Sequence, residues 1–226
     1  MKKNITQEEV NEKIRLDLSY INYDNIVKKK LPYKFSYVDE WLLKKSKLLT
    51  NEANALENSL NGQKNVQSYR TYGRGTIIKA DFGIGIGSEM SQVHFAIVMN
   101  NYDNPKNNIL TVVPLTSKSN KFNINLSTLI AELFIDKVHK DLEKFDRKDK
   151  LTPAEIIKVN KIATLLEYYK TYIKTTYACP SLITTISKER IFPPINEYDI
   201  MGKAKCPKDM MKTIDNAIND RFFTQE

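Results

Sequence analysis

The 226-residue sequence predicts an α+β protein: a small antiparallel β-barrel or twisted sheet with helices before, within and after it. Short runs rich in β-branched residues, separated by turn residues, occupy residues 74–117. Apolar residues at helical spacing occupy much of residues 1–70 and 122–175. We therefore expect a helical N-terminal extension at 1–70 and a barrel domain at 71–226, interrupted by a helical insertion at about 122–175.

The N-terminal extension contains two segments with helical periodicity, Thr6–Val27 and Val38–Ser59. Pro32 lies between them, where a helix is expected to break. The only tryptophan, Trp41, lies on the apolar side of the second segment, and we expect it to be a packing anchor.

Three strands are predicted at residues 74–82, 94–100 and 109–115. Pro114 has no N–H to give to a neighbouring strand, which favours an edge strand or a bulge there. Five of the seven glycines lie between Gly73 and Gly87, so the link between the first two strands is expected to be a hairpin loop with positive φ angles.

The second half of the chain returns to helical periodicity from about Leu126 to Ile173, and one apolar stripe comprises Leu129, Ile130, Leu133, Phe134 and Val138. Thr152 and Glu155 have the spacing of a capping box, with proline at the first helical position. Strand character returns at Tyr177–Ile186, and an amphipathic helix is predicted at Pro207–Phe222.

The composition limits which partners, compartments and metal sites are expected. A net charge of +8 and a pI near 9.2 favour an anionic partner, either nucleic acid or an acidic protein, although a lysine-rich composition alone would give the same charge. No apolar run is long enough to span a membrane, and the N-terminus lacks the apolar region of a secretory signal, so we expect a cytoplasmic protein. Cys179 and Cys206 are too few for a disulfide framework or a four-cysteine metal site, and buried thiols are expected.

The glycine-rich loop does not have the spacing of a nucleotide-binding turn. Gly83, Gly85 and Gly87 lack both the G-x-G-x-x-G pattern and the G-K-[ST] ending of a P-loop. A loop flanking a polymer-binding groove is the better interpretation.

Five motifs follow one another along the chain: Arg74-Gly75, Asp81-Phe82, Gly87-Ser88-Glu89, the strand at 95–100 and Val113-Pro-Leu-Thr-Ser117. In this order they resemble the MazF/PemK toxins of bacterial toxin–antitoxin systems. A later block, Ile183–Ile191, is similar to a family strand, and Asp209–Ala217 is similar to the family's C-terminal helix. The resemblance covers residues 73–118 and 176–223.

The resemblance implies an SH3-like barrel of the MazF/CcdB type, a homodimer, and a metal-independent endoribonuclease that needs no cofactor. Its substrate would be single-stranded RNA, including mRNA. The ribose 2′-hydroxyl attacks the adjacent phosphorus, which leaves a 2′,3′-cyclic phosphate and a 5′-hydroxyl end. Such chemistry requires a base, an acid and donors that stabilise the charged intermediate.

The family's catalytic arginine aligns with His94, and its threonine aligns with Thr116. The resemblance therefore implies His94, Thr116 and Ser117 as catalytic residues. Histidine transfers protons near neutral pH, whereas arginine is a permanent cation. A histidine bonded only to backbone is the alternative interpretation of His94.

Four further residues are expected to contact RNA. Lys79 and Lys118 could supply the positive charge that is lost where His94 replaces the family's arginine. Ser88 belongs to the glycine-loop motif. Thr184 occupies the place of another family arginine. Arg74 is expected to support the fold, and Glu89 to anchor the loop.

Two questions are left open by the sequence. Tyr168, Tyr169, Tyr172 and Tyr177 lie among lysines, which suits stacking on single-stranded nucleic acid, but their spacing also suits a core face. The barrel could also be a non-catalytic, CcdB-like binder of gyrase or another protein, or a degenerate RNA-binding barrel. The basic charge predicts an acidic antitoxin protein as partner.

Overall fold

The computed structural model describes residues 8, 36–62, 68–143, 145 and 151–223, and they divide into two compact units. The helix unit contains α3 (Val38–Leu60) and the loop Phe82–Gln92. The sheet unit contains Tyr69–Asp81 and the described residues from Val93 onward. No helix in these ranges is both long and apolar enough to cross a membrane.

The helix unit confirms the second predicted helix, because α3 covers Val38–Leu60. The predicted helix at Thr6–Val27 lies outside the described residues. Gly83 adopts φ +72°, and a Cβ there would lie 2.4 Å from the ring of Trp41, so the indole packs directly on the glycine backbone. Both the expected packing role of Trp41 and the positive φ in the glycine loop are therefore confirmed.

Glu89 fixes the shape of the glycine loop. Its carboxylate accepts the backbone N–H of Ile86 at 2.8 Å, and the Ser91 hydroxyl accepts the N–H of Gly85 at 3.0 Å. The expected anchoring role of Glu89 agrees with these contacts.

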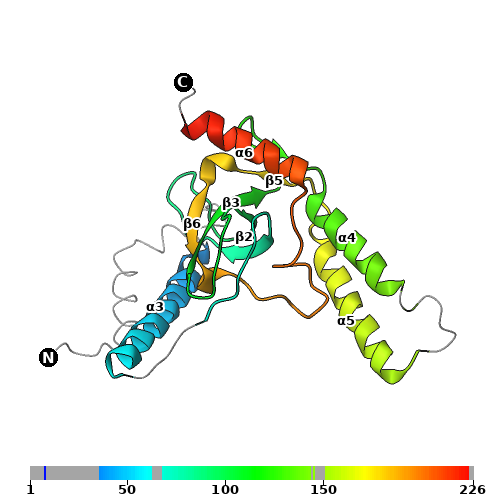
Figure 1. Ribbon diagram of the computed structural model, residues 1–226, viewed down its shortest axis with the longest axis horizontal. Helices are drawn as coiled ribbons and strands as arrows, with labels where there is room; N and C mark the ends of the chain where they lie inside the picture. Colours follow the sequence, from blue (N-terminus) through cyan, green and yellow to red (C-terminus); the bar gives the residue numbers. More distant parts are fainter. Residues whose placement is uncertain (1–7, 9–35, 63–67, 144, 146–150, 224–226) are drawn as a thin grey trace. The chain divides into compact units, whose positions relative to one another are not determined.

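The sheet unit is built on a six-stranded antiparallel sheet (Figure 1). The strand order is β1-β2-β3-β5-β4, and β6 also pairs with β3. The strands are β1 (Ile77–Asp81), β2 (Val93–Val98), β3 (Ile109–Thr116), β4 (Ile124–Asn125), β5 (Tyr177–Ala178) and β6 (Thr184–Ser187). The predicted α+β class is confirmed, but the paired strands do not form a closed sheet, so the SH3-like barrel stays a prediction.

Strand β3 lies inside the sheet, and this corrects the expectation for Pro114. One edge of β3 pairs with β2, with Pro114 opposite Ala96. The other edge pairs with β6 up to Val112 and with β5 from Leu115 onward. Pro114 is therefore not in an edge strand; it lies where β3 changes partner, and there the missing N–H interrupts neither ladder.

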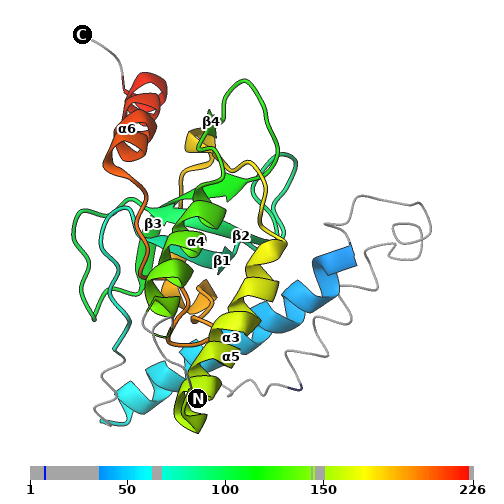
Figure 2. The same cartoon turned by 90° about the vertical axis from the view of Figure 1, so that its right-hand side faces the viewer.

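Three helices accompany the sheet: α4 (Leu129–Leu142), α5 (Pro153–Lys170) and α6 (Lys208–Phe222). Helices α4 and α5 lie side by side, and we call them the helical hairpin (Figures 1 and 2). The predicted capping box starts α5, since the Thr152 side chain accepts the N–H of Glu155 and the Glu155 carboxylate accepts the N–H of Thr152.

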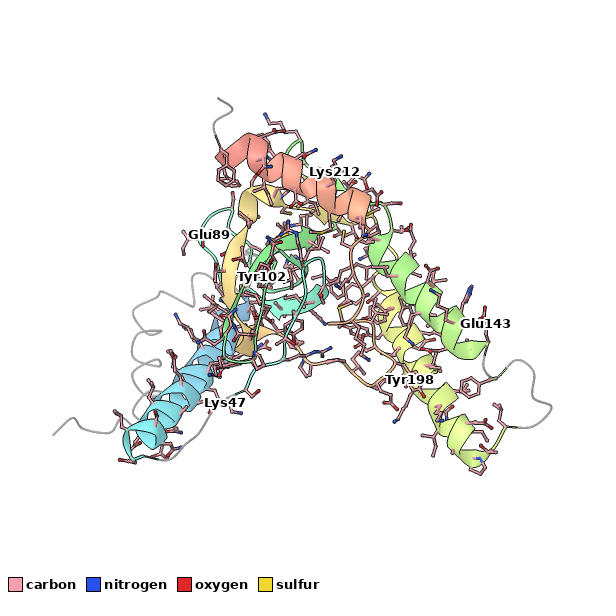
Figure 3. The ribbon with its side chains drawn as sticks, in the orientation of Figure 1. Lys47, Glu89, Tyr102, Glu143, Tyr198 and Lys212 are labelled. Carbon is pink, nitrogen blue, oxygen red and sulfur yellow. The ribbon has the colours of Figure 1, made fainter. Side chains whose placement is uncertain are left out.

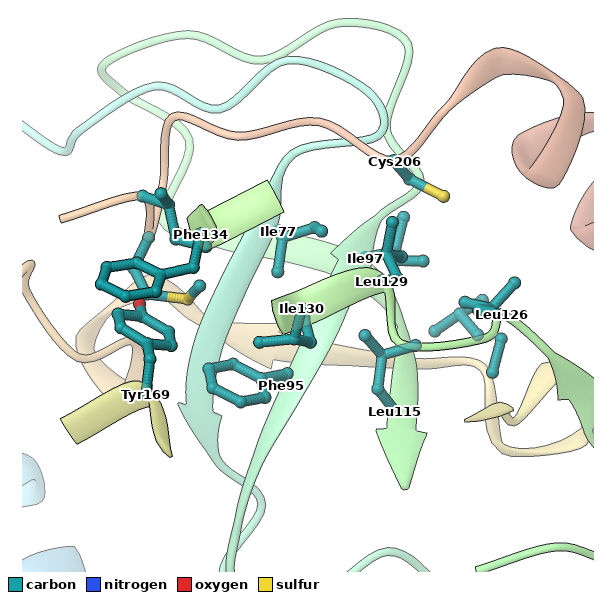
Figure 4. Close-up of a cluster of buried hydrophobic side chains, with 14 of the residues drawn as sticks. Ile77, Phe95, Ile97, Leu115, Leu126, Leu129, Ile130, Phe134, Tyr169 and Cys206 are labelled. Atoms are coloured by element: carbon teal, nitrogen blue, oxygen red, sulfur yellow. The ribbon is translucent and has the colours of Figure 1, made fainter. Parts of the chain in front are cut away.

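One hydrophobic core joins the sheet to the helical hairpin (Figure 4). The sheet contributes Ile77, Phe95, Ile97, Val113 and Leu115; α4 contributes Leu129, Ile130, Phe134 and Val138; α5 contributes Ile162, Leu165 and Tyr169. These α4 residues are four of the five members of the stripe predicted from the sequence, and the fifth, Leu133, is partly buried against the core. The stacked rings of Phe134 and Tyr169, 4.2 Å between centroids, join the two helices.

A buried ion pair fixes the loop between β2 and β3. Lys188, which directly follows β6, donates to the carboxylate of Asp103 at 2.7 Å, and the two side chains are only 3% and 2% exposed. The N–H of Tyr72 and the side-chain amide of Asn107 also donate to this carboxylate, at 2.8 and 3.1 Å. This contact ties together three segments that are far apart in the sequence.

Candidate active site

A cavity of about 210 Å³ opens where β1, β2 and β3 meet the end of the helical hairpin. Its polar lining includes Lys79, His94, Thr116, Ser117, Tyr172 and Lys174. We call it the His94 cavity. Three of these residues come from strands, one follows β3, and two come from the segment after α5.

Strand register brings His94 and Thr116 together, whereas Lys79 pairs with Phe95 and is not grouped with them by register. His94 of β2 pairs with Ala80 of β1. On the other side of β2, Ala96 pairs with Pro114 of β3. Two residues further along this register, His94 lies opposite Thr116. Residues opposite each other in an antiparallel sheet point to the same face, so the imidazole and the Thr116 hydroxyl face one side. Thr116 in turn pairs with Tyr177 of β5.

The His94 ring makes a defined backbone contact. Its Nδ1 lies 2.9 Å from the carbonyl oxygen of Leu115. A carbonyl can only accept, so Nδ1 carries the hydrogen and, in the neutral ring, Nε2 carries the lone pair. This contact fixes the tautomer of the neutral ring and agrees with both interpretations of His94, so its catalytic role stays a prediction.

Lys79 lines the same cavity. Its Nζ donates a hydrogen bond to the hydroxyl of Tyr168 in α5. The carbonyl of Lys79 accepts the N–H of Phe192 at 2.8 Å, which brings that ring beside β1. The expected contact of Lys79 with RNA stays a prediction.

Hydroxyl groups complete the polar wall. The Thr116 hydroxyl oxygen accepts the N–H of Lys118 at 3.2 Å, which leaves the hydroxyl hydrogen to point elsewhere. Ser117 is exposed at the cavity rim. The three residues expected to be catalytic, His94, Thr116 and Ser117, therefore line one cavity.

Three residues expected to contact RNA do not line the His94 cavity. Lys118 is exposed beside Ser117, and Thr184 is exposed on β6, where it pairs with Val112. Ser88 is exposed in the loop of the helix unit. Their roles stay predictions.

Sequence reasoning missed part of the lining. Thr171, Thr175 and Thr176 line the cavity together with Tyr172 and Lys174. Isolated threonines after a helix carry no local signal, and only the return of the chain from α5 to β5 brings them to this place.

Tyr169 differs in its environment from Tyr168 and Tyr172. Tyr169 is buried, and its hydroxyl donates to Asp199 at 2.6 Å, so it belongs to the core. Tyr168 and Tyr172 are half-buried, and Tyr172 lines the cavity with its ring 4.8 Å from that of Phe95, edge to face. The core interpretation therefore holds for Tyr169, and stacking of the other tyrosines on nucleic acid stays a prediction.

Other groups named in the sequence analysis lie outside the cavity. Arg74 donates to the carbonyl of Met99 and pairs with Asp215 of α6, in agreement with a supporting role. Cys179 and Cys206 are free buried thiols, as predicted. Within the described ranges, no three histidine, cysteine or acidic side chains are close enough together to hold a metal ion.

The fold and the cavity define an α+β protein with one cavity that is lined by a histidine, a lysine, a threonine and a serine. Residues 73–167 match the model of the family described as the PemK-like, MazF-like toxin of type II toxin–antitoxin systems, so this part of the chain is similar to those toxins. A search of curated proteins gives no match.

The matched range contains His94, Thr116 and Ser117 and most of the helical hairpin. Toxins of this family are paired with an antitoxin protein and are generally RNA-cleaving endoribonucleases. The blocks at Ile183–Ile191 and Asp209–Ala217 lie outside the match, and their resemblance stays a prediction.

Proposed function

We propose that the His94 cavity cleaves single-stranded RNA without a metal ion. The observation that carries the proposal is the bond between His94 Nδ1 and the Leu115 carbonyl, because it assigns the basic lone pair to Nε2 of a histidine that lines one cavity with Lys79, Thr116 and Ser117. The domain match agrees with an RNA-cleaving toxin.

The first step is proton removal from a ribose 2′-hydroxyl by Nε2 of His94. The 2′ oxygen then bonds to the adjacent phosphorus, and the bond from phosphorus to the 5′ oxygen breaks. The 5′ oxygen takes up a proton from water or from the imidazolium, and the products are a 2′,3′-cyclic phosphate and a 5′-hydroxyl end. His94 returns to its neutral form when the proton leaves.

The pentacoordinate intermediate carries extra negative charge, which needs donors fixed in advance. The ammonium of Lys79 and the hydroxyls of Thr116 and Ser117 are the groups in the cavity that can provide them. Removing one such donor from an enzyme typically slows the reaction about 10²–10³-fold. Lys79 in this scheme takes over the electrostatic task of the arginine that His94 replaces.

The partner proposals follow from charge and family. The net charge of +8 suits RNA and also an acidic antitoxin, which would compete for the same surface. A homodimer, the barrel closure and RNA contacts from Ser88, Lys118 and Thr184 belong to the same proposal.

The test uses purified full-length protein, a labelled single-stranded RNA and excess chelator. The wild type should cut the RNA, and His94→Gln should abolish cutting, because the amide can still donate to the Leu115 carbonyl but cannot remove a proton. His139→Gln is the matched control, since His139 is the only other histidine and lies exposed on α4.

Intact RNA with the wild type would refute the nuclease. The non-catalytic, CcdB-like binder would then be tested by inhibition of gyrase supercoiling. Equal cutting by the wild type and His94→Gln would refute the role of His94 and keep the nuclease.

A further inference from the structure

The ammonium group of Lys79 lies among three aromatic rings. Its Nζ is 4.9 Å from the ring centroid of Tyr168, 5.5 Å from that of Phe192 and 5.9 Å from that of Tyr172. All three distances are within the range of cation–π attraction. We call these three side chains the lysine cage.

Tyr168 makes the closest contact in the lysine cage. In addition to the ring contact, its hydroxyl oxygen accepts a hydrogen bond from Lys79 Nζ. The Tyr172 hydroxyl lies 3.4 Å from the same oxygen. Burial raises the pKa of Tyr168, so its phenol stays neutral at physiological pH and acts on the ammonium as an acceptor.

The lysine cage fixes a group that is ordinarily mobile. The ammonium of a lysine is carried on a flexible four-carbon stem, and an exposed lysine side chain samples many rotamers. Donors that are held in place before the reaction stabilise developing charge best, since nothing has to reorganise at the moment of reaction. A caged ammonium on a residue that lines the same cavity as His94 and Thr116 meets that requirement.

We propose that Tyr168 is a positioning residue, which holds the Lys79 ammonium where the phosphate charge develops. The inference rests on the proposed RNA cleavage, in which Lys79 stabilises the intermediate. It also gives the helical hairpin a function: α5 supplies the residue that orients the cation of the active site.

Tyr168 could instead serve only the core, because its ring also packs edge to face on Tyr169, at 5.0 Å between centroids. The two roles differ in one respect. A positioning residue acts through Lys79 and has no effect once Lys79 is gone, whereas a core residue has the same effect with or without it.

A double-mutant cycle separates the two roles. Cleavage of single-stranded RNA is measured as kcat and KM for the wild type, Tyr168→Phe, Lys79→Met and the double variant. Tyr168→Phe keeps the ring and removes the acceptor, and we expect a fall in kcat of about tenfold, since a hydrogen bond to a charged group is lost, with a smaller change in KM. Lys79→Met should lower kcat by about a hundredfold.

The decisive comparison is between Lys79→Met and the double variant. Equal kcat values in these two proteins are expected, because without the ammonium the Tyr168 hydroxyl has nothing to position. Additive losses in an active enzyme would overturn the positioning role and leave the nuclease in place. A wild type that leaves RNA intact would overturn both.

Tyr169→Phe is the matched control, because it removes a hydroxyl from the neighbouring residue of the same helix. That hydroxyl binds Asp199, and Tyr169 does not line the cavity. We expect a lower unfolding midpoint and an unchanged kcat, measured where circular dichroism shows all variants folded. Tyr102→Phe, at the 91%-exposed tyrosine labelled in Figure 3, should change neither quantity.

A spectroscopic measurement tests the cage without activity. Protons on Cε of Lys79 should resonate upfield of the other lysines in the wild type, because three ring currents act on them. In Tyr168→Ala this shift should shrink. An unshifted Lys79 signal in the wild type would show that the cage does not hold the ammonium.

Discussion

The ion pair between Lys188 and Asp103 is expected to be a major stabilising contact of the sheet unit. In Lys188→Met the ammonium is replaced by an apolar side chain of similar length, and the carboxylate of Asp103 stays buried without its cation. Removing one partner of a buried pair typically destabilises a protein by about 3–5 kcal/mol.

The structure sets where in that range the effect should fall. Asp103 keeps the N–H of Tyr72 and the amide of Asn107 as donors after the substitution. Burial opposes ionisation of Asp103, but the bonds from Lys188, Tyr72 and Asn107 together hold its pKa below the usual value. With two of three donors left, we expect a loss near the lower end, about 3 kcal/mol.

Urea unfolding at pH 7, followed by far-ultraviolet circular dichroism, measures this loss. The double variant Lys188→Met/Asp103→Asn should recover much of the stability, because it removes the unpaired charge. Lys161→Met is the control: it breaks the exposed pair with Glu197 and should change the midpoint little. A Lys188→Met midpoint equal to that of this control would refute the reasoning.

In the wild type, acid should remove the stability that the ionised Asp103 carboxylate contributes. The folded-state pKa of Asp103 is depressed, so its stabilisation is present above the unfolded value near 4 and is lost as the pH falls below it.

Two further predictions concern the thiols and the glycine loop. Burial raises the pKa of Cys179 to about 11 and of Cys206 to about 12, so both should resist a thiol reagent at pH 8 until urea unfolds the protein. Rapid labelling of the folded protein would contradict this expectation. The thiols ionise at a lower pH in the unfolded chain than in the folded protein, so the free energy of unfolding should fall as the pH rises from about 9 to 11. Gly83→Ala should destabilise the helix unit by more than the roughly 1–2 kcal/mol of a left-handed residue, because the new Cβ meets Trp41, and tryptophan fluorescence in urea measures this loss. Gly87→Ala, also at positive φ but with open space around it, should lose less.

Features set by local chemistry could be predicted from the sequence. The β-branched runs became β1, β2 and β3, and the capping box at Thr152 marks the start of α5, because each depends on neighbouring residues alone. The association of His94 with Thr116 followed from the family motifs, and strand register accounts for it physically.

Contacts between distant segments could not be predicted. The lysine cage joins Lys79 to Tyr168, 89 positions away, and no local pattern connects a strand lysine with a helix tyrosine. Pro114 shows the same limit: its missing N–H is tolerated inside the sheet because β3 changes partner there, and this depends on where β5 and β6 return. The two-residue strand β4 is too short to leave a sequence signal.

The most direct test of the account uses an RNA whose cleavage site has been mapped and a copy with a single 2′-deoxynucleotide at that site. Both are incubated with the wild type in chelator, and the product ends are identified. Attack by the 2′-hydroxyl predicts that the RNA gives 2′,3′-cyclic phosphate and 5′-hydroxyl ends and that the substituted copy stays intact at that position. Cutting of the substituted copy at the same site, or 5′-phosphate ends, would contradict the role assigned to His94.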